Sequence, residues 1–306
     1  MDITIKQKLK GFAASNIFAF ATIGLNKLML SRYLADGAGT LVFSEFVIIP
    51  ILMGIICSWN WRRLRLHGAT SSLYSIYNSF LAILLSSIFL GEGVICLIIV
   101  SPLIFCFMWL GTYIGNKMFE ADNNNLNVSI IALLLFVFIT DSVSKHQYEN
   151  EVSDTITVNA SPDKVWQNVV AFKKIKQKNS FWLFKIGLPS PMETTVDGYY
   201  KGAGRKCIFS NGYVFGEKIS TYEPRKDLVF DITDQPRDPE IMNHLDLIRG
   251  EFVLKDNEDG TTTLTGNSWY KLYVFPAWYY DIWAQSIVRN VHVRVMEHIK
   301  EISENN

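Results

Sequence analysis

Cysteine is scarce in this chain, and the chain as a whole has no excess of charge of either sign. The 306 residues include 4 cysteines, and Cys57, Cys96 and Cys106 fall in strongly apolar segments. Cys207 is therefore alone in the rest of the sequence, which excludes a disulfide there and leaves the redox compartment open. The 29 basic residues balance the 29 acidic ones. Because no basic patch is present, we expect no nucleic-acid partner.

Signatures of metal and cofactor chemistry are also missing. The sequence has no HExxH, CxxC or GxGxxG motif, and the spacings of His244, His292 and His298 do not suit a metal site. We therefore expect neither a metal nor a cofactor. His298 lies on an apolar helical stripe, where a core histidine bonded to a backbone carbonyl is the simplest interpretation. His292 lies at the edge of that stripe, where a polar role in a pocket is the alternative to a core role.

Charge is unevenly distributed, and this divides the chain near residue 145. The first part contains long uncharged runs such as 46–57, whereas charges follow every few residues in the second part. A chain in lipid does not tolerate that second pattern. We predict a transmembrane helical bundle over 1–144 and a globular domain over 145–306.

Five apolar segments approach the roughly 20 residues that cross a bilayer. The predicted spans are 12–34, 39–59, 71–91, 93–115 and 126–143. The last span is short and follows a run of asparagines, and it decides the topology. With five spans the globular domain lies outside the cytoplasm, and with four spans it lies in the cytoplasm.

Basic residues set the orientation of the bundle. Lysines up to Lys10 precede the first span, and arginines from Arg62 follow the second span. Because lysine and arginine favour cytoplasmic loops, both groups are expected inside. The sequence thus predicts an integral protein of the plasma or inner membrane, with the lipid bilayer as a partner and the C-terminal domain extracytoplasmic. It identifies no protein partner.

Two charges fall inside predicted spans. Lys27 precedes the outer end of the first span by about seven residues, and Glu45 follows the outer start of the second by about six. Their depths match at about 1.5 Å per residue. Each side chain can reach the interface alone, or the two can form a structural ion pair, which we predict. A transport role lacks a second buried acid.

The pattern of the second part, 145–306, predicts strands between helices. Ser161, Pro162 and Asp163 form a helix start with Ser161 as N-cap, and a second short helical piece is expected over 172–184. Expected strands cover 155–158, 205–210, 213–221, 228–233, 244–254 and 261–273. Turn residues at 211–212 and 256–260 indicate hairpins. Apolar residues spaced three or four apart predict one long helix over 277–303.

Four blocks and the final helix together resemble a known family. The blocks are Ile156–Trp166, Gly202–Phe209, Gly250–Leu254 and Gly260–Leu264. In this order they resemble the START-like superfamily, also called SRPBCC, which contains polyketide cyclases and lipid-transfer domains. The resemblance covers nearly all of 150–304. It implies an α+β helix-grip fold, in which an antiparallel sheet wraps around the long C-terminal helix and encloses a cavity.

The expected cavity would be lined by aromatic residues that exceed the needs of a small core. The candidate ligand-binding residues are Cys207, Phe209, Tyr213, Phe215, Phe230, His244, Trp269, Tyr273, Trp283 and His292. No catalytic residue is assigned, because the sequence of this part shows no Ser-His-Asp motif and no pair of acids.

Three function classes follow from these features. We favour a membrane-anchored domain that binds a hydrophobic small molecule, namely a lipid, an isoprenoid or an aromatic compound. An enzyme similar to a polyketide cyclase or aromatase is the alternative, and it requires polar groups inside the cavity. A structural or regulatory anchor is the third class, and a solidly packed interior would favour it.

Overall fold

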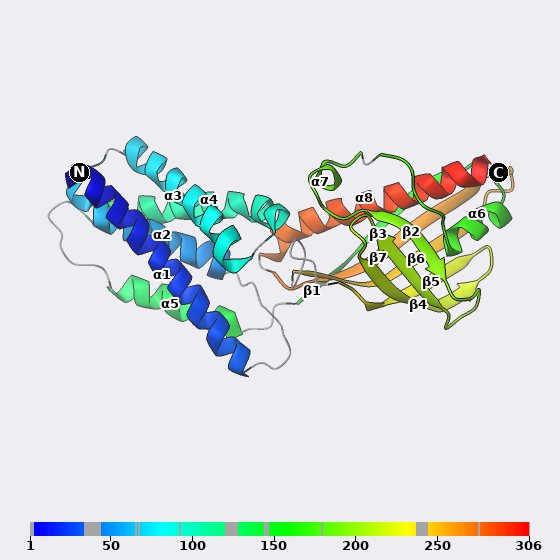
Figure 1. Ribbon diagram of the computed structural model, residues 1–306, viewed down its shortest axis with the longest axis horizontal. Coiled ribbons are helices and arrows are strands. Elements are labelled where there is room, and N and C mark those ends of the chain that lie inside the picture. The colour runs from blue at the N-terminus through cyan, green and yellow to red at the C-terminus, as the bar shows by residue number, and fades with distance from the viewer. Residues whose placement is uncertain are drawn as a thin grey trace. The chain divides into compact units, whose positions relative to one another are not determined.

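The computed structural model describes residues 3–33, 44–64, 66, 68–91, 93–119, 128–143, 147–178, 180–236, 244–274 and 276–305. The chain divides into two compact units (Figure 1). The helical unit comprises Met1–His146, Pro239–Asn243 and Val274–Pro276. The globular unit comprises Gln147–Asp238, His244–Tyr273 and Ala277–Asn306.

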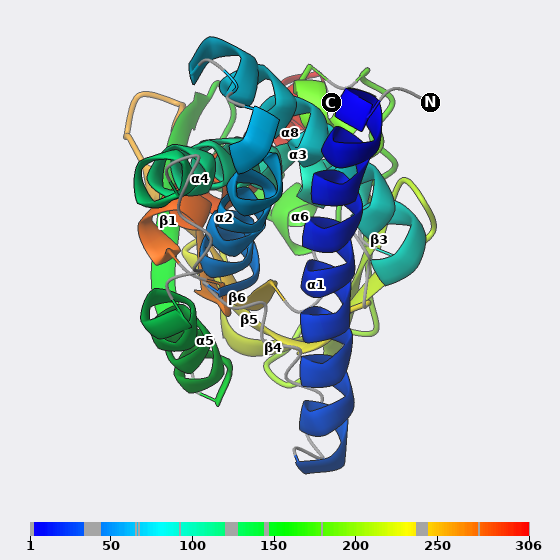
Figure 2. The same cartoon turned by 90° about the vertical axis from the view of Figure 1, so that its left-hand side faces the viewer.

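Helices form at each of the apolar segments of the first part. They are α1 (Ile3–Tyr33), α2 (Ile49–Trp61), α3 (Gly68–Leu90), α4 (Val94–Met118) and α5 (Val128–Val143). A short π-helix, η1 (Ser44–Ile48), leads into α2, and a 3₁₀ turn, η2 (Arg62–Leu64), follows it. Helix α2 packs against α1 and α4 (Figures 1 and 2).

Small residues allow α2 and α4 to approach closely. Gly111 lies against the main chain of Ile51, and Gly54 lies against the main chain of Met108, so a side chain at either glycine would overlap backbone atoms. Gly111 and Gly115 are spaced as in the small-xxx-small pattern of helix pairs in membranes. This glycine spacing therefore fixes the contact between the two helices.

Three segments of the described chain are long and apolar enough to cross a membrane. They are Glu45–Leu64, Gly68–Leu90 and Val94–Met118. Neither α1 nor α5 meets the same criteria of length and composition, so the count of five spans stays a prediction. Glu45 is buried, at 8% exposure. The Lys27 side chain lies outside the described residues, and the Lys27–Glu45 ion pair therefore stays a prediction too.

A seven-stranded antiparallel sheet forms most of the globular unit (Figure 1). The strands are β1 (Tyr148–Val158), β2 (Pro191–Val196), β3 (Gly204–Phe209), β4 (Val214–Glu223), β5 (Asp227–Asp234), β6 (Leu245–Asp256) and β7 (Thr262–Leu272). Their order across the sheet is β1-β7-β6-β5-β4-β3-β2. All pairs of neighbouring strands are therefore consecutive in the chain except the β1–β7 pair.

The two predicted hairpin turns are confirmed. Gly212 joins β3 to β4 with φ +86°, a conformation that favours glycine. Its N–H donates to the carbonyl of Phe209 at 2.9 Å, and the Phe209 N–H donates to the carbonyl of Tyr213 at 2.8 Å. Gly260 has φ +86° in the turn between β6 and β7.

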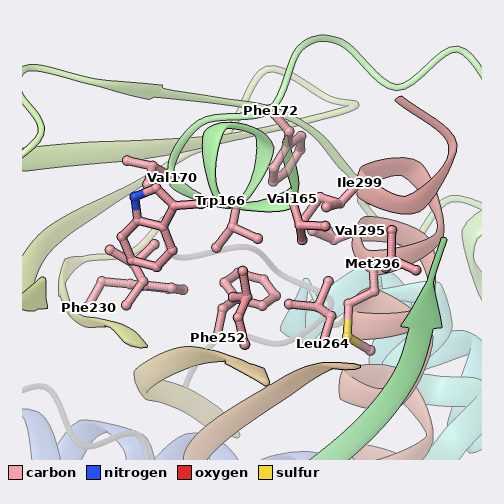
Figure 3. Packing of buried hydrophobic residues seen from close by; sticks show 14 of the residues in the cluster. Val165, Trp166, Val170, Phe172, Phe230, Phe252, Leu264, Val295, Met296 and Ile299 are labelled. Atoms are coloured by element: carbon pink, nitrogen blue, oxygen red, sulfur yellow. The ribbon is translucent and has the colours of Figure 1, made fainter. Parts of the chain in front are cut away.

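The long helix α8 (Ala277–Glu304) lies along the sheet, as predicted (Figure 1). Val295, Met296 and Ile299 on its inner face are buried. They pack in one core with α6 (Pro162–Val170) and with residues of β5, β6 and β7 such as Phe252 (Figure 3). The globular unit therefore has the α+β helix-grip fold that the sequence resemblance implied.

One local prediction is corrected by the structure, and one strand was not predicted. The helical piece expected over 172–184 is only one turn, α7 (Trp182–Lys185), because the preceding segment is extended and bonds to β2, with the Thr194 N–H donating to the Phe172 carbonyl. Strand β2 was not predicted. Ser161 is the N-cap of α6, as predicted, although its hydroxyl makes no cap bond. Its backbone carbonyl accepts the N–H groups of Lys164 and Val165.

Candidate functional site

A cavity of about 80 Å³ lies between α8 and the sheet. Its lining residues are Phe172, Pro191, Thr194, Arg205, Cys207, Phe209, Phe215, Glu217, Phe230, Ile232, Leu247, Arg249, Gly250, Glu251, Phe252, Asn267, Ser268, Val291, His292 and Val295. Figure 3 shows that Phe172, Phe230, Phe252 and Val295 also belong to the packed core. The cavity is thus a gap in the core, with an aromatic wall.

An ion pair is buried in this wall. Arg205 on β3 and Glu217 on β4 are cross-strand partners, and their side chains form a salt bridge at 2% and 4% exposure. The Arg205 guanidinium also donates to the carbonyl of Val170 at 3.1 Å and lies 4.3 Å from the ring centre of Phe230. Burial raises the pKa of Glu217, and the adjacent Arg205 opposes that rise. The pair supplies fixed polar groups within apolar surroundings.

Cys207 lies beside this ion pair. Burial raises the pKa of its thiol, Glu217 adds to the rise, and Arg205 opposes it. Because the thiolate is the reactive form, Cys207 is a protonated and inert wall residue at neutral pH.

A second polar group in the cavity joins three elements. His292 on α8 lies with Nε2 2.8 Å from the Ser268 hydroxyl on β7 and with Nδ1 3.0 Å from the Asp154 carboxylate on β1. His292 is 5% exposed. Arg289 donates to the other carboxylate oxygen of Asp154 at 2.8 Å. Ser268 therefore contacts His292, and His292 contacts Asp154, in one continuous line of polar side chains. Ser268 and His292 also line the cavity.

Protonation of this group follows from its surroundings. Burial lowers the pKa of His292, Asp154 raises it, and Arg289 lowers it. The lowered pKa makes the imidazole neutral at pH 7. An ionised carboxylate only accepts hydrogen bonds, so Nδ1 carries the proton toward Asp154. Nε2 is then an acceptor for the Ser268 hydroxyl.

A further buried cluster holds the start of α8 to the sheet. The Asp281 carboxylate accepts from the Tyr270 hydroxyl at 2.5 Å, from Asn150 at 3.0 Å and from Gln285 at 2.7 Å. Burial and the neighbouring Asp281 raise the pKa of Tyr270, so the phenol stays a donor. These bonds fix α8, and with it His292, against β1 and β7.

Half of the ten predicted ligand-binding residues line the cavity. These are Cys207, Phe209, Phe215, Phe230 and His292. Their side chains come from β3, β4, β5 and α8, as the alternation of strand residues indicated. Their role as ligand contacts stays a prediction.

The other five predicted residues lie away from this cavity. They are Tyr213, His244, Trp269, Tyr273 and Trp283. Trp269 lies between Ser268 and Tyr270 on β7, so its side chain points to the opposite face of the sheet. Tyr273 donates to Asp246 at 2.9 Å beyond the end of β7, and the Trp283 ring lies 6.5 Å from the Trp182 ring.

Several lining residues were missed by the sequence reasoning. Arg205 and Glu217 were missed, and they are 12 positions apart. Asp154, the missed partner of His292, is 138 positions from it, so no local spacing reveals that second pair. One signal was available for the first pair. The glycine-led hairpin centred on 211–212 places Arg205 opposite Glu217, and an arginine on an inward strand position demands an acidic partner.

A larger cavity, of about 450 Å³, lies along α8 beside the segment that precedes and includes α7. His298 lines it and bonds through Nε2 to the carbonyl of Lys173 at 2.8 Å, as expected for a core histidine bonded to the backbone. Charged residues such as Lys178, Glu297 and Glu301 form much of the lining. That lining does not suit an apolar ligand.

Comparisons with known proteins find likeness in structure alone. No family model matches the chain, and no curated protein matches its sequence. Norcoclaurine synthase from Thalictrum flavum shares 10% identity over 53% of this chain and 98% of its own, with a TM-score of 0.37. Zhui aromatase/cyclase from Streptomyces sp. R1128 shares 13% identity over 52% of this chain and 95% of its own, with a TM-score of 0.36. The fold assignment rests on the strand order and on the position of α8.

Proposed function

We propose that the globular unit binds a small apolar molecule with one polar group, and that the helical unit anchors it to a membrane. The composition of the cavity wall carries the proposal. Phe209, Phe215 and Phe230 supply apolar surface, whereas the Arg205–Glu217 pair supplies fixed hydrogen-bonding groups. Small-molecule sites combine these two features, with few polar groups in an apolar lining.

The size of the cavity favours a small ligand. Its 80 Å³ compares with the roughly 10–15 Å³ that one water molecule needs in a cavity and with about 150 Å³ for an engineered cavity that binds benzene. A ring or a short chain therefore requires a shift of wall side chains such as Phe209 and Phe215, whose rings lie 4.7 Å apart. A long lipid or isoprenoid chain requires a much larger opening of α8 from the sheet.

Anchoring would place the cavity where apolar molecules concentrate. The three long apolar helical segments support this part of the proposal by their length and composition. Such a segment inserts because every backbone polar group is satisfied within the helix. The globular unit would then sample ligands that partition into the bilayer.

Mass spectrometry of small molecules extracted from the purified full chain tests the binding. The chain would be purified in two different detergents, so that detergent-derived signals can be subtracted. We expect one reproducible apolar molecule from the unmodified chain and its loss from Cys207→Leu, because the added side-chain volume fills the cavity. Val214→Leu is the matched control, since Val214 is 38% exposed on the neighbouring strand.

Two results would contradict the proposal. The first is an identical extract from the unmodified chain, Cys207→Leu and Val214→Leu, which would show that the molecule is not held in the cavity. The second is the absence of any enriched molecule in both detergents, which would favour the structural anchor.

A further inference from the structure

We propose that Ser268 is an activated nucleophile and that the globular unit cleaves short-chain carboxylic esters through an acyl-serine. The linked side chains of Ser268, His292 and Asp154 carry this inference. It rests on the proposed function in one respect, namely that the same cavity admits the acyl group.

The hydrogen bonds have the polarity that such a reaction requires. The Asp154 carboxylate lies 3.0 Å from Nδ1 of His292, which assigns the proton to Nδ1. Nε2, 2.8 Å from the Ser268 hydroxyl oxygen, then accepts the proton of that hydroxyl. A serine hydroxyl becomes a competent nucleophile when an adjacent base accepts its proton. The base is in turn oriented by a carboxylate, which is the arrangement found in serine hydrolases on several unrelated folds.

The position of each residue adds to the argument. Ser268 is only partly buried and lines the cavity together with His292, so an entering acyl group meets both. Arg289 donates to the second carboxylate oxygen of Asp154 at 2.8 Å, which holds the carboxylate in place beside His292. Asp154 is a positioning residue, since it acts through His292.

The reaction balances without a further reactant except water. The Ser268 oxygen bonds to the ester carbonyl carbon while its proton passes to Nε2 of His292. The bond from that carbon to the alkoxy oxygen breaks, and the leaving alcohol takes the proton from His292. Water then adds to the acyl-serine, releases the carboxylic acid and restores the hydroxyl.

The lining also bears on the substrate. A volume of 80 Å³ is several times the roughly 10–15 Å³ that one water molecule needs in a cavity, which suits a small acyl group. Arg205 also lines the cavity, but its guanidinium is paired with Glu217, so we assign it no part in the reaction.

A purely structural role makes a different prediction for the same contacts. His292 is hydrogen-bonded through both nitrogens, and a histidine that only ties α8 to β1 and β7 would leave Ser268 unreactive. Reactivity of Ser268 therefore separates the two interpretations.

The test is covalent labelling of the full chain in detergent with a fluorophosphonate probe, followed by peptide mass mapping. We expect the label on Ser268 and release of nitrophenolate from p-nitrophenyl acetate. Both should vanish in Ser268→Ala. The labelling rate should fall by about 100-fold or more in His292→Gln, since a positioned base contributes about 10²–10⁴. The labelling rate of Asp154→Asn should also fall strongly, because the asparagine favours the wrong imidazole tautomer of His292.

Ser153→Ala is the matched control, because Ser153 is exposed on β1 beside Asp154. It should keep the full labelling rate. Circular dichroism and thermal melting of each variant would exclude unfolding, and Ser268→Ala keeps the test decisive if His292→Gln does not fold.

The inference is overturned if the folded, unmodified chain carries no label on Ser268, or if folded His292→Gln is labelled at the unmodified rate. The extracted molecules of Ser268→Ala separate this outcome from the proposed function. Retention of the ligand with no labelling of the unmodified chain would contradict the reaction alone. Labelling of Ser268 without any retained ligand would contradict ligand storage alone.

Discussion

Arg205 and Glu217 face each other across β3 and β4 and form a salt bridge that is almost completely buried. Two charges removed from water are costly unless each keeps its partner. Arg205 also donates to the carbonyl of Val170, so the pair ties the sheet to the end of α6.

Removing one member of this pair should lower the free energy of unfolding more than removing both. Arg205→Met and Glu217→Leu should each lower the free energy of unfolding by about 3–5 kcal/mol, because each leaves an uncompensated buried charge. The double variant should be close to neutral against the original chain. Urea unfolding followed by tryptophan fluorescence measures all three. Additive losses in the double variant would show that the two charges do not depend on each other.

The stability of the globular unit should fall as the pH falls below about 6.5, the ordinary histidine value. Burial lowers the pKa of His292 in the folded chain, so the unfolded chain binds the proton first. The contribution of neutral, buried His292 to folding stability is thus present above about pH 6.5 and is lost as the pH falls toward the pKa of His292 in the folded chain. Glu217 has a raised pKa and acts in the opposite direction. The comparison of the unmodified chain with His292→Gln by melting at pH 7.5 and pH 5.5 therefore isolates the histidine, and a parallel loss in both chains would contradict its role.

Gly111→Ala should destabilise the helical unit although alanine is the better helix former. A side-chain carbon at 111 would overlap the main chain of Ile51, which cannot move aside as a side chain can. We expect a loss of about 1–3 kcal/mol from overpacking. Gly24→Ala is the control, because a side chain there meets no other atom within 4 Å. Thermal melting in detergent compares the stabilities of the two variants. Equal changes in melting temperature would show that the contact between α2 and α4 does not require glycine at position 111.

Reporter fusions after positions 65 and 145 should report opposite compartments. This follows if all five predicted segments span the membrane, because three of them lie between those positions. Alkaline phosphatase, which is active outside the cytoplasm, should be inactive at 65 and active at 145. The same result at both positions would reduce the count to four spans and place the globular unit in the cytoplasm.

Local pattern was enough for much of the fold. The hairpin at Gly212 and the long helix after Pro276 each depend on neighbours in the chain, and each appears in the structure. The helix predicted over 172–184 was wrong for most of its length, because the segment before α7 bonds to β2 rather than to itself. Tertiary contact there overrides a helical pattern.

The candidate site was only half predictable. Period-two alternation identified Phe209 and Phe230 as inward residues, and both line the cavity. Trp269 was chosen from the surplus of aromatic residues rather than from alternation, and it lies on the opposite face from Ser268, since one position along a strand reverses the face. The choice of His244 depended on a loop position, which carries no information on direction.

The sequence by itself determined where apolar segments become helices, where the strands turn and which superfamily the globular part resembles, because these depend on composition and on short spacings. Only the tertiary structure decided the small size of the cavity, the burial of Arg205 against Glu217 and the line from Asp154 through His292 to Ser268. Those contacts join residues far apart in the chain. They depend on how β1, β7 and α8 pack, and packing is a property of the whole unit rather than of any segment.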